Sequence, residues 1–418
     1  MVHAEQPVTV KVDFGSIKGP AAHRASGFLH SISADQPDDR IVRQLKPKLF
    51  RRKAREALNP SIYQRLASFN AEVQSVISDA YGYPGKSRAW PGDGDDWSAW
   101  ENLVEELLQD ANSKGLRVLW DVWNEPDLSM FWDRSAEQFF ETWKRAVNTI
   151  RRVDPKAIIV GPSLAKGAYY LYGFLLKAHA NNVLPDIISW HDVSLDHPNN
   201  VSSVRQFMAK YQIPDRPISI NEFQPADGKY RPGLTVWWLA HIEDEGPDSA
   251  AYACWQDPTG YWDCDVNTLD GLLTADGQAR SIWFAHKGYA EITGQLVDVL
   301  IPGAKIAGIA GVDEALQSAR VLLGRREFPD SSKLSTVEVV CKGLDRVSYL
   351  IEDGKIFVRA ERIPDSGTLP LDRPQATIAE DYKVVDNEIR ITLPDFGAWE
   401  GYTMVLGKDA RNASSTLP

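Results

Sequence analysis

The chain has 418 residues, of which 43% are hydrophobic and 25% are charged. These values are ordinary for a folded globular protein, and they exclude a mainly disordered, collagen-like or disulfide-scaffold chain. The 46 Lys and Arg residues against 57 Asp and Glu residues give a net charge of −11. Such a surface repels phosphate backbones, so we expect no nucleic-acid partner. No run approaches the ~20 apolar residues of a membrane span, so we expect no membrane span either.

The first pattern along the chain predicts a strand. Val8, Val10, Val12 and Phe14 alternate with polar residues, which is typical of a strand with one buried face. Short apolar runs that predict eight further strands follow at Gly27–Ile32, Leu49–Arg52, Glu72–Ser78, Val118–Trp123, Ala157–Val160, Asp186–Trp190, Pro217–Ile220 and Ala250–Trp255.

Helical patterns separate these runs. The clearest has apolar residues at helical spacing on one face, at Trp97, Trp100, Leu103, Val104, Leu107, Leu108 and Ala111. Two further helices are predicted around Phe140–Ile150 and Val204–Tyr211. Eight strands alternating with helices predict an α/β fold, a (β/α)8 TIM barrel, over residues 18–294. The alternative, a doubly wound sheet, lacks a Gly-rich fingerprint after its first strand.

After Gly294 the pattern changes to strands and turns. Alternating apolar residues predict strands around Val337–Cys341, Ile356–Ala360 and Ile389–Leu393, and Asp353-Gly354 predicts a hairpin turn between two of them. We therefore expect an attached antiparallel β-sandwich over residues 295–418. The N-terminal strand, within residues 1–17, is expected to join it because chain ends often lie close together.

The three cysteines are Cys254, Cys264 and Cys341, and no two have CxxC spacing. A zinc site or redox motif is therefore unsupported, and we expect neither a metal nor a cofactor. A Cys254–Cys264 bridge is one alternative, but two or three buried free thiols is the one that we favour. The N-terminus has no apolar signal core. We expect a secreted or periplasmic protein whose leader has been removed, with a cytoplasmic protein as the alternative.

Barrel enzymes carry their chemistry at the C-terminal ends of the strands. The fourth predicted strand ends in Asp121-Val-Trp-Asn-Glu-Pro-Asp127, and the seventh ends in Ser219-Ile-Asn-Glu-Phe223. Both strands therefore close on Asn-Glu. Because strands four and seven face each other across a barrel mouth, Glu125 and Glu222 form a pair of carboxylates suited to glycosidic bond cleavage.

A structural interpretation of the first motif must be weighed against this one. Asn and Asp cap helices and Pro favours their first turn, so Asn-Glu-Pro-Asp also fits a strand-to-helix turn. Two Asn-Glu ends on opposite strands of a predicted barrel favour the catalytic interpretation.

These motifs resemble a known group of enzymes. Trp123-Asn-Glu-Pro-Asp127 and Asn221-Glu222-Phe223 look like those of the clan A retaining glycoside hydrolases. Within the clan, the longer Asp121–Asp127 motif resembles family 39, which includes β-xylosidases, α-L-iduronidases and bacterial exopolysaccharide hydrolases. The resemblance covers both the barrel and the β-sandwich.

The resemblance implies that Glu125 is the general acid/base and Glu222 the nucleophile of a retaining glycoside hydrolase. Double displacement then requires a raised pKa for Glu125 and an ionised Glu222. Asn124 is expected to bind the sugar hydroxyl beside the anomeric carbon.

The resemblance also implies three residues at other strand ends. His191 ends strand six, where the clan usually has His-x-Tyr, but this chain reads His191-Asp192-Val193 and lacks the tyrosine. Trp255 ends strand eight, where the clan often has a stacking Trp. Arg51 matches the arginine that binds the nucleophile, with the adjacent Arg52 as the alternative.

Two further residues are substrate-binding candidates only because they lie at or just after the ends of predicted strands. His30 ends strand one, and Asp257 follows Trp255. A structural histidine and a solvated loop aspartate are the alternatives. The expected partner is a carbohydrate substrate, whose identity strand-end residues do not select, and the sequence does not indicate an oligomeric state. Two other functions stay open, namely a transglycosylase of the same fold and a non-catalytic carbohydrate-binding barrel.

Overall fold

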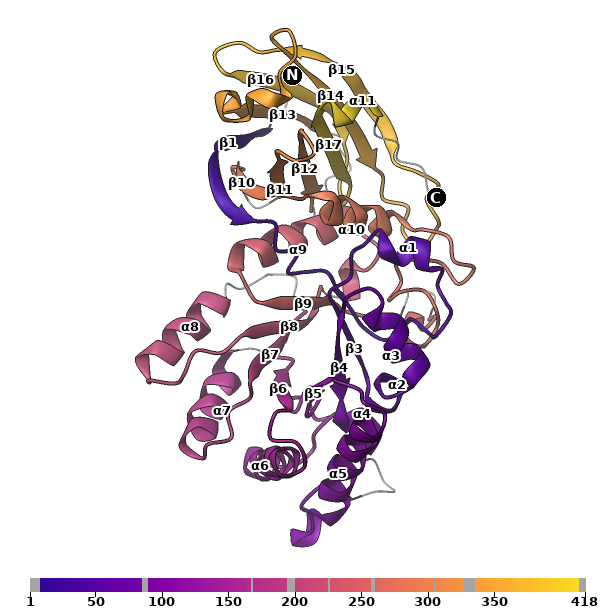
Figure 1. Ribbon diagram of the computed structural model, residues 1–418, viewed down its shortest axis with the longest axis vertical. Coiled ribbons are helices and arrows are strands. Elements are labelled where there is room, and N and C mark those ends of the chain that lie inside the picture. Colours follow the sequence, from indigo (N-terminus) through magenta and orange to yellow (C-terminus); the bar gives the residue numbers. More distant parts are fainter. Residues whose placement is uncertain are drawn as a thin grey trace, which may run out of the picture.

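The computed structural model (Figure 1) describes residues 8–84, 89–166, 168–193, 200–224, 226–256, 260–303, 305–326 and 335–412. It has two parts, a closed barrel of eight parallel strands and a nine-stranded, mostly antiparallel sheet. In the view of Figure 1 the sheet lies above the barrel. The predicted fold class, a TIM barrel with an attached β-sandwich, is confirmed.

The barrel strands follow one another in chain order around the closed barrel. Each overlaps one of the eight apolar runs of the sequence. They are β2 (Gly27–Phe28), β3 (Leu49–Lys53), β4 (Glu72–Val76), β5 (Leu119–Asp121), β6 (Ile158–Leu164), β7 (Ile187–Asp192), β8 (Ile218–Phe223) and β9 (Ser249–Tyr252). The short runs form strands because both of their faces are buried, one in the barrel interior and one under the helices.

The helices pack around this barrel with their apolar faces inward. In α5 all six of the buried residues, from Trp100 to Ala111, belong to the face that the sequence predicts. The helices are α1 (Asp39–Arg43), α2 (Ala54–Ala57), α3 (Pro60–Ala67), α4 (Ile77–Tyr81), α5 (Ser98–Ser113), α6 (Ala136–Val153), α7 (Ala168–Ala180), α8 (Asn200–Lys210), α9 (Pro232–Glu245), α10 (Ser281–Glu291) and, in the other part, α11 (Asp409–Asn412).

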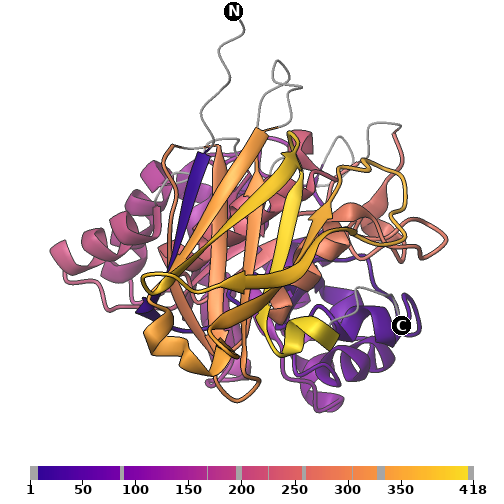
Figure 2. The same ribbon diagram turned by 90° about the horizontal axis from the view of Figure 1, so that it is seen from above.

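The sheet has the strand order β15-β14-β17-β12-β11-β10-β1-β13-β16. Its strands are β1 (Val8–Pro20), β10 (Gln295–Leu300), β11 (Ile306–Asp313), β12 (Ser318–Arg325), β13 (Ser335–Lys342), β14 (Lys355–Ile363), β15 (Gln375–Lys383), β16 (Glu388–Phe396) and β17 (Gly401–Gly407). The N-terminal strand β1 lies inside the sheet, antiparallel to β10 and parallel to β13. The sheet bends around its own core until the edge strands β15 and β16 come close together, as the view from above in Figure 2 illustrates.

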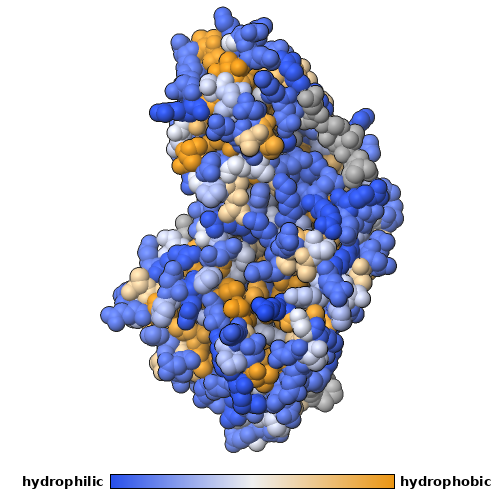
Figure 3. Space-filling model, viewed as in Figure 1, coloured by the Kyte–Doolittle hydropathy of each residue, from blue (hydrophilic) through white to orange (hydrophobic). Residues whose placement is uncertain are grey.

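The sheet packs on helices α9 and α10 of the barrel. The chain approaches the sheet most closely at Gly233, whose N–H donates to the carbonyl of Trp399 at 2.6 Å. A Cβ at Gly233 would lie 2.3 Å from the carbonyl oxygen of Arg325 and 2.4 Å from that of Glu400. Figure 3 shows a mostly hydrophilic face, hollowed on one side where the two parts meet.

The Asp353-Gly354 turn forms, but not between two paired strands as the sequence predicts. Both residues have positive φ, 50° and 71°, and the turn closes only the short bridge between Glu352 and Lys355. Strands β13 and β14, which flank this region, have different neighbours in the sheet. The prediction is wrong because a turn signal shows where the chain reverses but not which strands then pair.

No helix in the described part of the chain is long and apolar enough to cross a membrane.

Candidate active site

The carboxyl ends of the barrel strands bring four of the predicted site residues together. Asn124 and Glu125 follow β5, while His191 lies in β7 and Glu222 in β8. The two neighbouring strands place His191 opposite Glu222 in their register. Arg51, in β3, reaches the same place from across the barrel. Residues up to 171 positions apart in the chain therefore share one site.

Arg51 connects these residues through three hydrogen bonds. Its Nη1 donates to Glu222 Oε1 at 2.7 Å, its Nη2 to Asn124 Oδ1 at 2.8 Å, and its Nε to Asp121 Oδ2 at 2.7 Å. The side chain is almost completely buried. Burial lowers the pKa of Arg51, but the neighbouring carboxylates of Asp121 and Glu222 outweigh this effect and raise it. Of the two arginines that the sequence offers, Arg51 thus contacts Glu222, whereas Arg52 binds the carbonyl of His30 and the carboxylate of Glu56.

His191 touches both glutamates. Its Nδ1 lies 2.8 Å from Glu125 Oε1, and its Nε2 lies 3.8 Å from Glu222 Oε1. The Nε2 atom is buried and has no hydrogen-bond partner among the described residues. Burial opposes the charged form of the imidazole, but the two carboxylates overcome this and raise the pKa of His191. One imidazole ring therefore lies between the two candidate catalytic groups.

The pKa shifts of Glu125 and Glu222 are opposite to those that the sequence analysis expects for a catalytic acid and a nucleophile. Burial raises the pKa of Glu125, but the hydrogen bond to His191 and the charges of His191 and Arg51 together outweigh burial and lower this pKa below its usual value. Burial raises the pKa of Glu222, against the opposing effects of His191 and Arg51. The expectation of a raised pKa for Glu125 is therefore wrong, because sequence motifs do not reveal that His191 contacts this carboxyl group. The two shifts together favour a charged imidazole at His191 beside an ionised carboxyl group at Glu125.

The backbone at the Asn-Glu motif is held in an unusual conformation. Glu125 has a φ of +47°, and its N–H donates to the carbonyl of Ser163 at 2.9 Å. Asp127, the last residue of the motif, accepts the N–H groups of Ala165 at 2.8 Å and Lys166 at 2.6 Å. Positive φ is rare outside glycine and is concentrated at functional sites. No helix begins here, so the structural interpretation of the motif as a helix cap is wrong, although Asp127 does anchor the loop after β6.

Sequence reasoning missed a buried polar layer below the site. Asp121, which has no exposed surface, accepts from Arg51 and from Ser163 Oγ at 2.8 Å and Asn221 Nδ2 at 3.0 Å. Ser163 Oγ also lies 3.0 Å from Asn221 Nδ2. Asp121 and Asn221 were visible in the two motifs, and a charged or amide side chain inside an otherwise apolar strand is the signal that could have found them.

Three predicted substrate-binding residues remain, namely Trp255, His30 and Asp257. Trp255 is partly buried, and its indole N–H donates to the carbonyl of Gln224, two residues after Glu222, at 3.0 Å. Burial and the nearby arginines lower the pKa of His30 well below its usual value, and its buried Nδ1 has no partner among the described residues. The structure thus shows a His30 with a buried ring nitrogen, whose neutral form is favoured. Asp257 lies outside the described residues.

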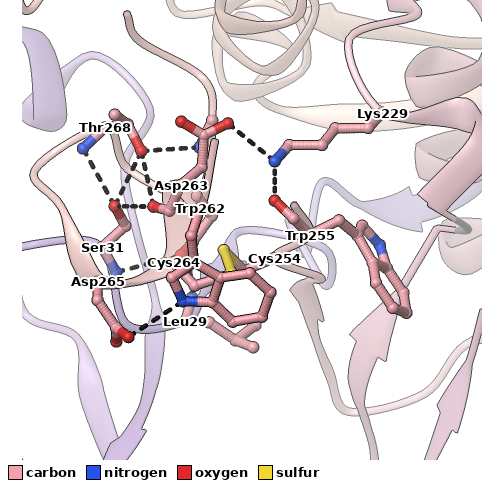
Figure 4. Close-up of a disulfide and its surroundings, with 12 residues drawn as sticks. Leu29, Ser31, Lys229, Cys254, Trp255, Trp262, Asp263, Cys264, Asp265 and Thr268 are labelled. Carbon is pink, nitrogen blue, oxygen red and sulfur yellow. Dashed lines mark hydrogen bonds and ion pairs between the residues drawn. A yellow bond between two sulfur atoms is a disulfide. The ribbon is translucent and has the colours of Figure 1, made fainter. Parts of the chain in front are cut away.

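The loop after β9 contains a disulfide that the sequence analysis disfavoured. Cys254 and Cys264 are bonded, with a Cα–Cα distance of 5.5 Å, whereas Cys341 is a buried free thiol. The expectation of free thiols is therefore wrong for the first two. They meet because the loop folds back on itself, with a bridge between Gln256 and Trp262. Figure 4 shows the disulfide next to the indole ring of Trp262, with the indole of Trp255 farther away.

The described residues contain no group of three or more His, Cys, Asp or Glu side chains that could hold a metal ion.

The chain is similar to known proteins both in sequence and in structure. Residues 88–225, which include Glu125 and Glu222, match the model of the glycosyl hydrolases family 39. The chain is 26% identical to the structure of N2152 from Neocallimastix frontalis, with a TM-score of 0.82, over 96% of this chain and 100% of that one. The chain is therefore similar to the family 39 glycosyl hydrolases, in sequence over residues 88–225 and in fold over nearly its whole length.

Two curated relatives of this family 39-like chain have named activities. It is 25% identical to a 3-O-α-D-galactosyl-α-L-arabinofuranosidase of Bifidobacterium longum subsp. longum, over 76% of this chain and 27% of the relative. It is 28% identical to a 3-O-β-L-arabinopyranosyl-α-L-arabinofuranosidase of Bifidobacterium pseudocatenulatum, over 36% of this chain and 16% of the relative. The chain thus spans about a quarter or less of the length of these two relatives.

Proposed function

We propose that this chain hydrolyses an O-glycosidic bond with retention of configuration, with Glu222 as the nucleophile and Glu125 as the general acid/base. The observation that carries the proposal is that a single imidazole, His191, touches both strand-end carboxylates while Arg51 binds one of them. Two carboxyl groups at one barrel mouth are the groups that glycoside cleavage requires.

In the first step, a Glu222 oxygen attacks the anomeric carbon, and the bond to the leaving oxygen breaks. The hydrogen bond from Arg51 to Glu222 favours the ionised form that attacks. Asn124 presents its amide NH2 group to the sugar, because its carbonyl oxygen already accepts from Arg51. Glu125 gives its proton to the leaving oxygen.

His191 supplies the proton for this step. Before substrate binds, the proton lies on the imidazole, whose Nδ1 is 2.8 Å from Glu125 Oε1. Transfer along this hydrogen bond makes Glu125 an acid when the leaving oxygen arrives. In the second step Glu125 takes a proton from water, the water oxygen attacks the anomeric carbon, and Glu222 is released as a carboxylate.

For the substrate, we propose an α-L-arabinofuranoside that carries a sugar on its O3. Both curated relatives are named as arabinofuranosidases acting on such 3-O-substituted units. The test is the release of a disaccharide, rather than of free arabinose, from arabinose-bearing polysaccharides. Release of xylose from xylosides instead would reject this substrate while leaving the mechanism in place.

Chemical rescue tests the two catalytic roles. With a dinitrophenyl glycoside, which needs little protonation, Glu125→Ala should complete the first step and accumulate the glycosyl-enzyme, because water then lacks its base. Azide should restore turnover and give a glycosyl azide with the configuration of the substrate. Glu222→Ala should lose turnover of all substrates, and azide should then give the opposite configuration. The measurements are burst kinetics, intact-protein mass and the anomeric NMR signal of the product.

Three results would contradict the proposal. An inverted azide product from Glu125→Ala would reverse the two roles. Transfer to sugar acceptors in preference to water would identify a transglycosylase. Binding of polysaccharide without turnover by the unmodified chain would identify a non-catalytic carbohydrate-binding barrel.

We also propose that the chain works in an oxidising compartment outside the cytoplasm. The support is the Cys254–Cys264 disulfide, because such bonds persist mainly in secreted and periplasmic proteins. Mass spectrometry after alkylation of the protein in its native host tests this. One reactive thiol per chain is expected after denaturation, and three would reject the proposal.

A further inference from the structure

One tryptophan is exposed although its residue type is usually buried. All 14 tryptophans lie in the described part of the chain, and only Trp262 is exposed, with half of its surface accessible. Its neighbour Tyr261 has 39% of its surface exposed. Large apolar side chains grouped on a surface mark a binding site more often than single scattered ones do.

Polar contacts hold the indole of Trp262 in one orientation. Its Nε1–H donates to Asp265 Oδ2 at 3.0 Å, and Asp265 Oδ1 accepts from Lys53 Nζ at 2.5 Å. A ring that is already fixed loses little conformational freedom when a ligand stacks on it. Trp262 is therefore both exposed and preorganised.

The loop that carries Trp262 is fastened on both sides. The Cys254–Cys264 disulfide packs in a small apolar cluster that includes Leu29 and Leu49. Next to Trp262, the completely buried Asp263 forms an ion pair with Lys229 at 2.8 Å. Its carbonyl oxygen accepts from Ser31 Oγ at 2.6 Å. Figure 4 shows Asp263, with its contact to Lys229, above the indole of Trp262 and the disulfide next to that ring.

The same loop belongs to the catalytic mouth of the barrel. Trp255, ten positions before Asp265, hydrogen-bonds the segment just after Glu222. Lys53, which holds Asp265, lies two residues after Arg51 on β3, and residues two apart in a strand point to the same side. Trp262 is thus connected to the active site from two directions, through its own loop and through the strand of Arg51.

We propose that Trp262 is the stacking platform of an outer carbohydrate subsite, which binds a sugar ring of the substrate glycan beyond the bond that is cleaved. The inference rests on the proposed glycoside hydrolase function and extends it to glycans longer than two sugars. Aromatic faces bind the apolar faces of sugar rings, while Asp265 and Lys53 offer hydrogen bonds to the hydroxyl groups around them.

The test compares Trp262→Ala with Trp262→Phe and with a matched control, Tyr211→Ala. Tyr211 is also an exposed aromatic residue, 43% accessible, but it follows the C-terminal end of α8, at the opposite end of the barrel from the site. The probes are a nitrophenyl α-L-arabinofuranoside and soluble arabinan, arabinoxylan and arabinogalactan. For each variant, kcat/KM on the best polysaccharide is divided by kcat/KM on the nitrophenyl glycoside.

For Trp262→Ala we expect this ratio to fall about five-fold to ten-fold, mainly through KM, as for the loss of one stacking contact. Trp262→Phe should recover most of the loss, and Tyr211→Ala should leave the ratio unchanged. An unchanged ratio for Trp262→Ala would overturn the inference, as would an equal fall for Tyr211→Ala.

A binding measurement separates this inference from the proposed function. Electrophoresis through gels that contain the same polysaccharides reports binding without turnover. Retardation of the unmodified chain that Trp262→Ala abolishes supports the subsite even if no glycoside is cleaved. Equal retardation of both proteins, or of neither, rejects the subsite even if the chain is an active hydrolase.

Discussion

At the scale of single residues, two side chains organise the candidate site. Arg51 fixes Glu222, Asn124 and Asp121 relative to one another with three short hydrogen bonds. His191 lies between the two glutamates, with its Nδ1 2.8 Å from Glu125 Oε1 and its Nε2 3.8 Å from Glu222 Oε1. A lysine could not replace Arg51, since its ammonium group lacks the planar fork that reaches several acceptors in fixed directions.

The role of His191 predicts a shift in the pH profile. Its pKa is raised above the usual value of 6.5, so the His191–Glu125 pair keeps its proton until the pH exceeds that raised pKa. In His191→Gln the proton must lie on Glu125 alone, a carboxyl group with a usual value of 4.5. The alkaline limb of kcat/KM should therefore move to lower pH, and kcat/KM at pH 7 should fall roughly 10-fold to 100-fold.

The control for this prediction is the substrate. A dinitrophenyl glycoside needs little protonation of its leaving group, so its alkaline limb should not depend on His191. Equal shifts of the limb for this glycoside and for one with a poor leaving group would contradict the role of His191 as proton holder.

At the scale of secondary-structure elements, one glycine determines how the barrel and the sheet fit together. Gly233, in the first turn of α9, lies directly against the backbone of Arg325, Trp399 and Glu400. Backbone atoms cannot move aside as a flexible side chain can. The close packing of α9 on the sheet therefore needs a residue without a Cβ at this place.

Gly233→Ala should destabilise the protein by about 1–3 kcal/mol or more, because its Cβ would force the helix away from the sheet. The matched control is Gly173→Ala in α7, where nothing lies within 4 Å of an added Cβ. That change should be neutral or stabilising by up to about 1 kcal/mol, since alanine favours the helix. Thermal and denaturant unfolding measure both. Equal stability of the two variants would show that the packing at Gly233 adjusts freely.

At the scale of the whole molecule, β1 joins the beginning of the chain to its end. It lies between β10 and β13, and Val10, Val12 and Phe14 have no exposed surface. Without β1, strands β13 and β16 would lose their connection to the rest of the sheet. The new edges would be long and apolar, which favours aggregation.

Deletion of residues 1–14 should therefore unfold or aggregate the protein, although it removes no residue of the candidate site. Even Phe14→Ala alone should cost about 3–5 kcal/mol, as for a buried aromatic side chain. Lys11→Ala, on the exposed face of the same strand, should change the stability by less than about 0.5 kcal/mol. Solubility, and unfolding followed by circular dichroism, check the three variants. A soluble truncated chain with unchanged melting would contradict the structural role of β1.

The sequence by itself determined the eight barrel strands, four of the nine strands of the second part (β1, β13, β14 and β16) and the two Asn-Glu ends. Each of these depends on a local pattern, either the alternation of buried residues or a motif at a strand end. Only the tertiary structure decided that Arg51 rather than Arg52 meets Glu222, that His191 contacts both carboxyl groups, and that β1 pairs in parallel with β13. It also decided that Cys254 and Cys264 are bonded, because the loop between them folds back. These contacts follow from how distant segments are packed, and hydrogen bonds and ion pairs require distances that no local pattern of residues specifies.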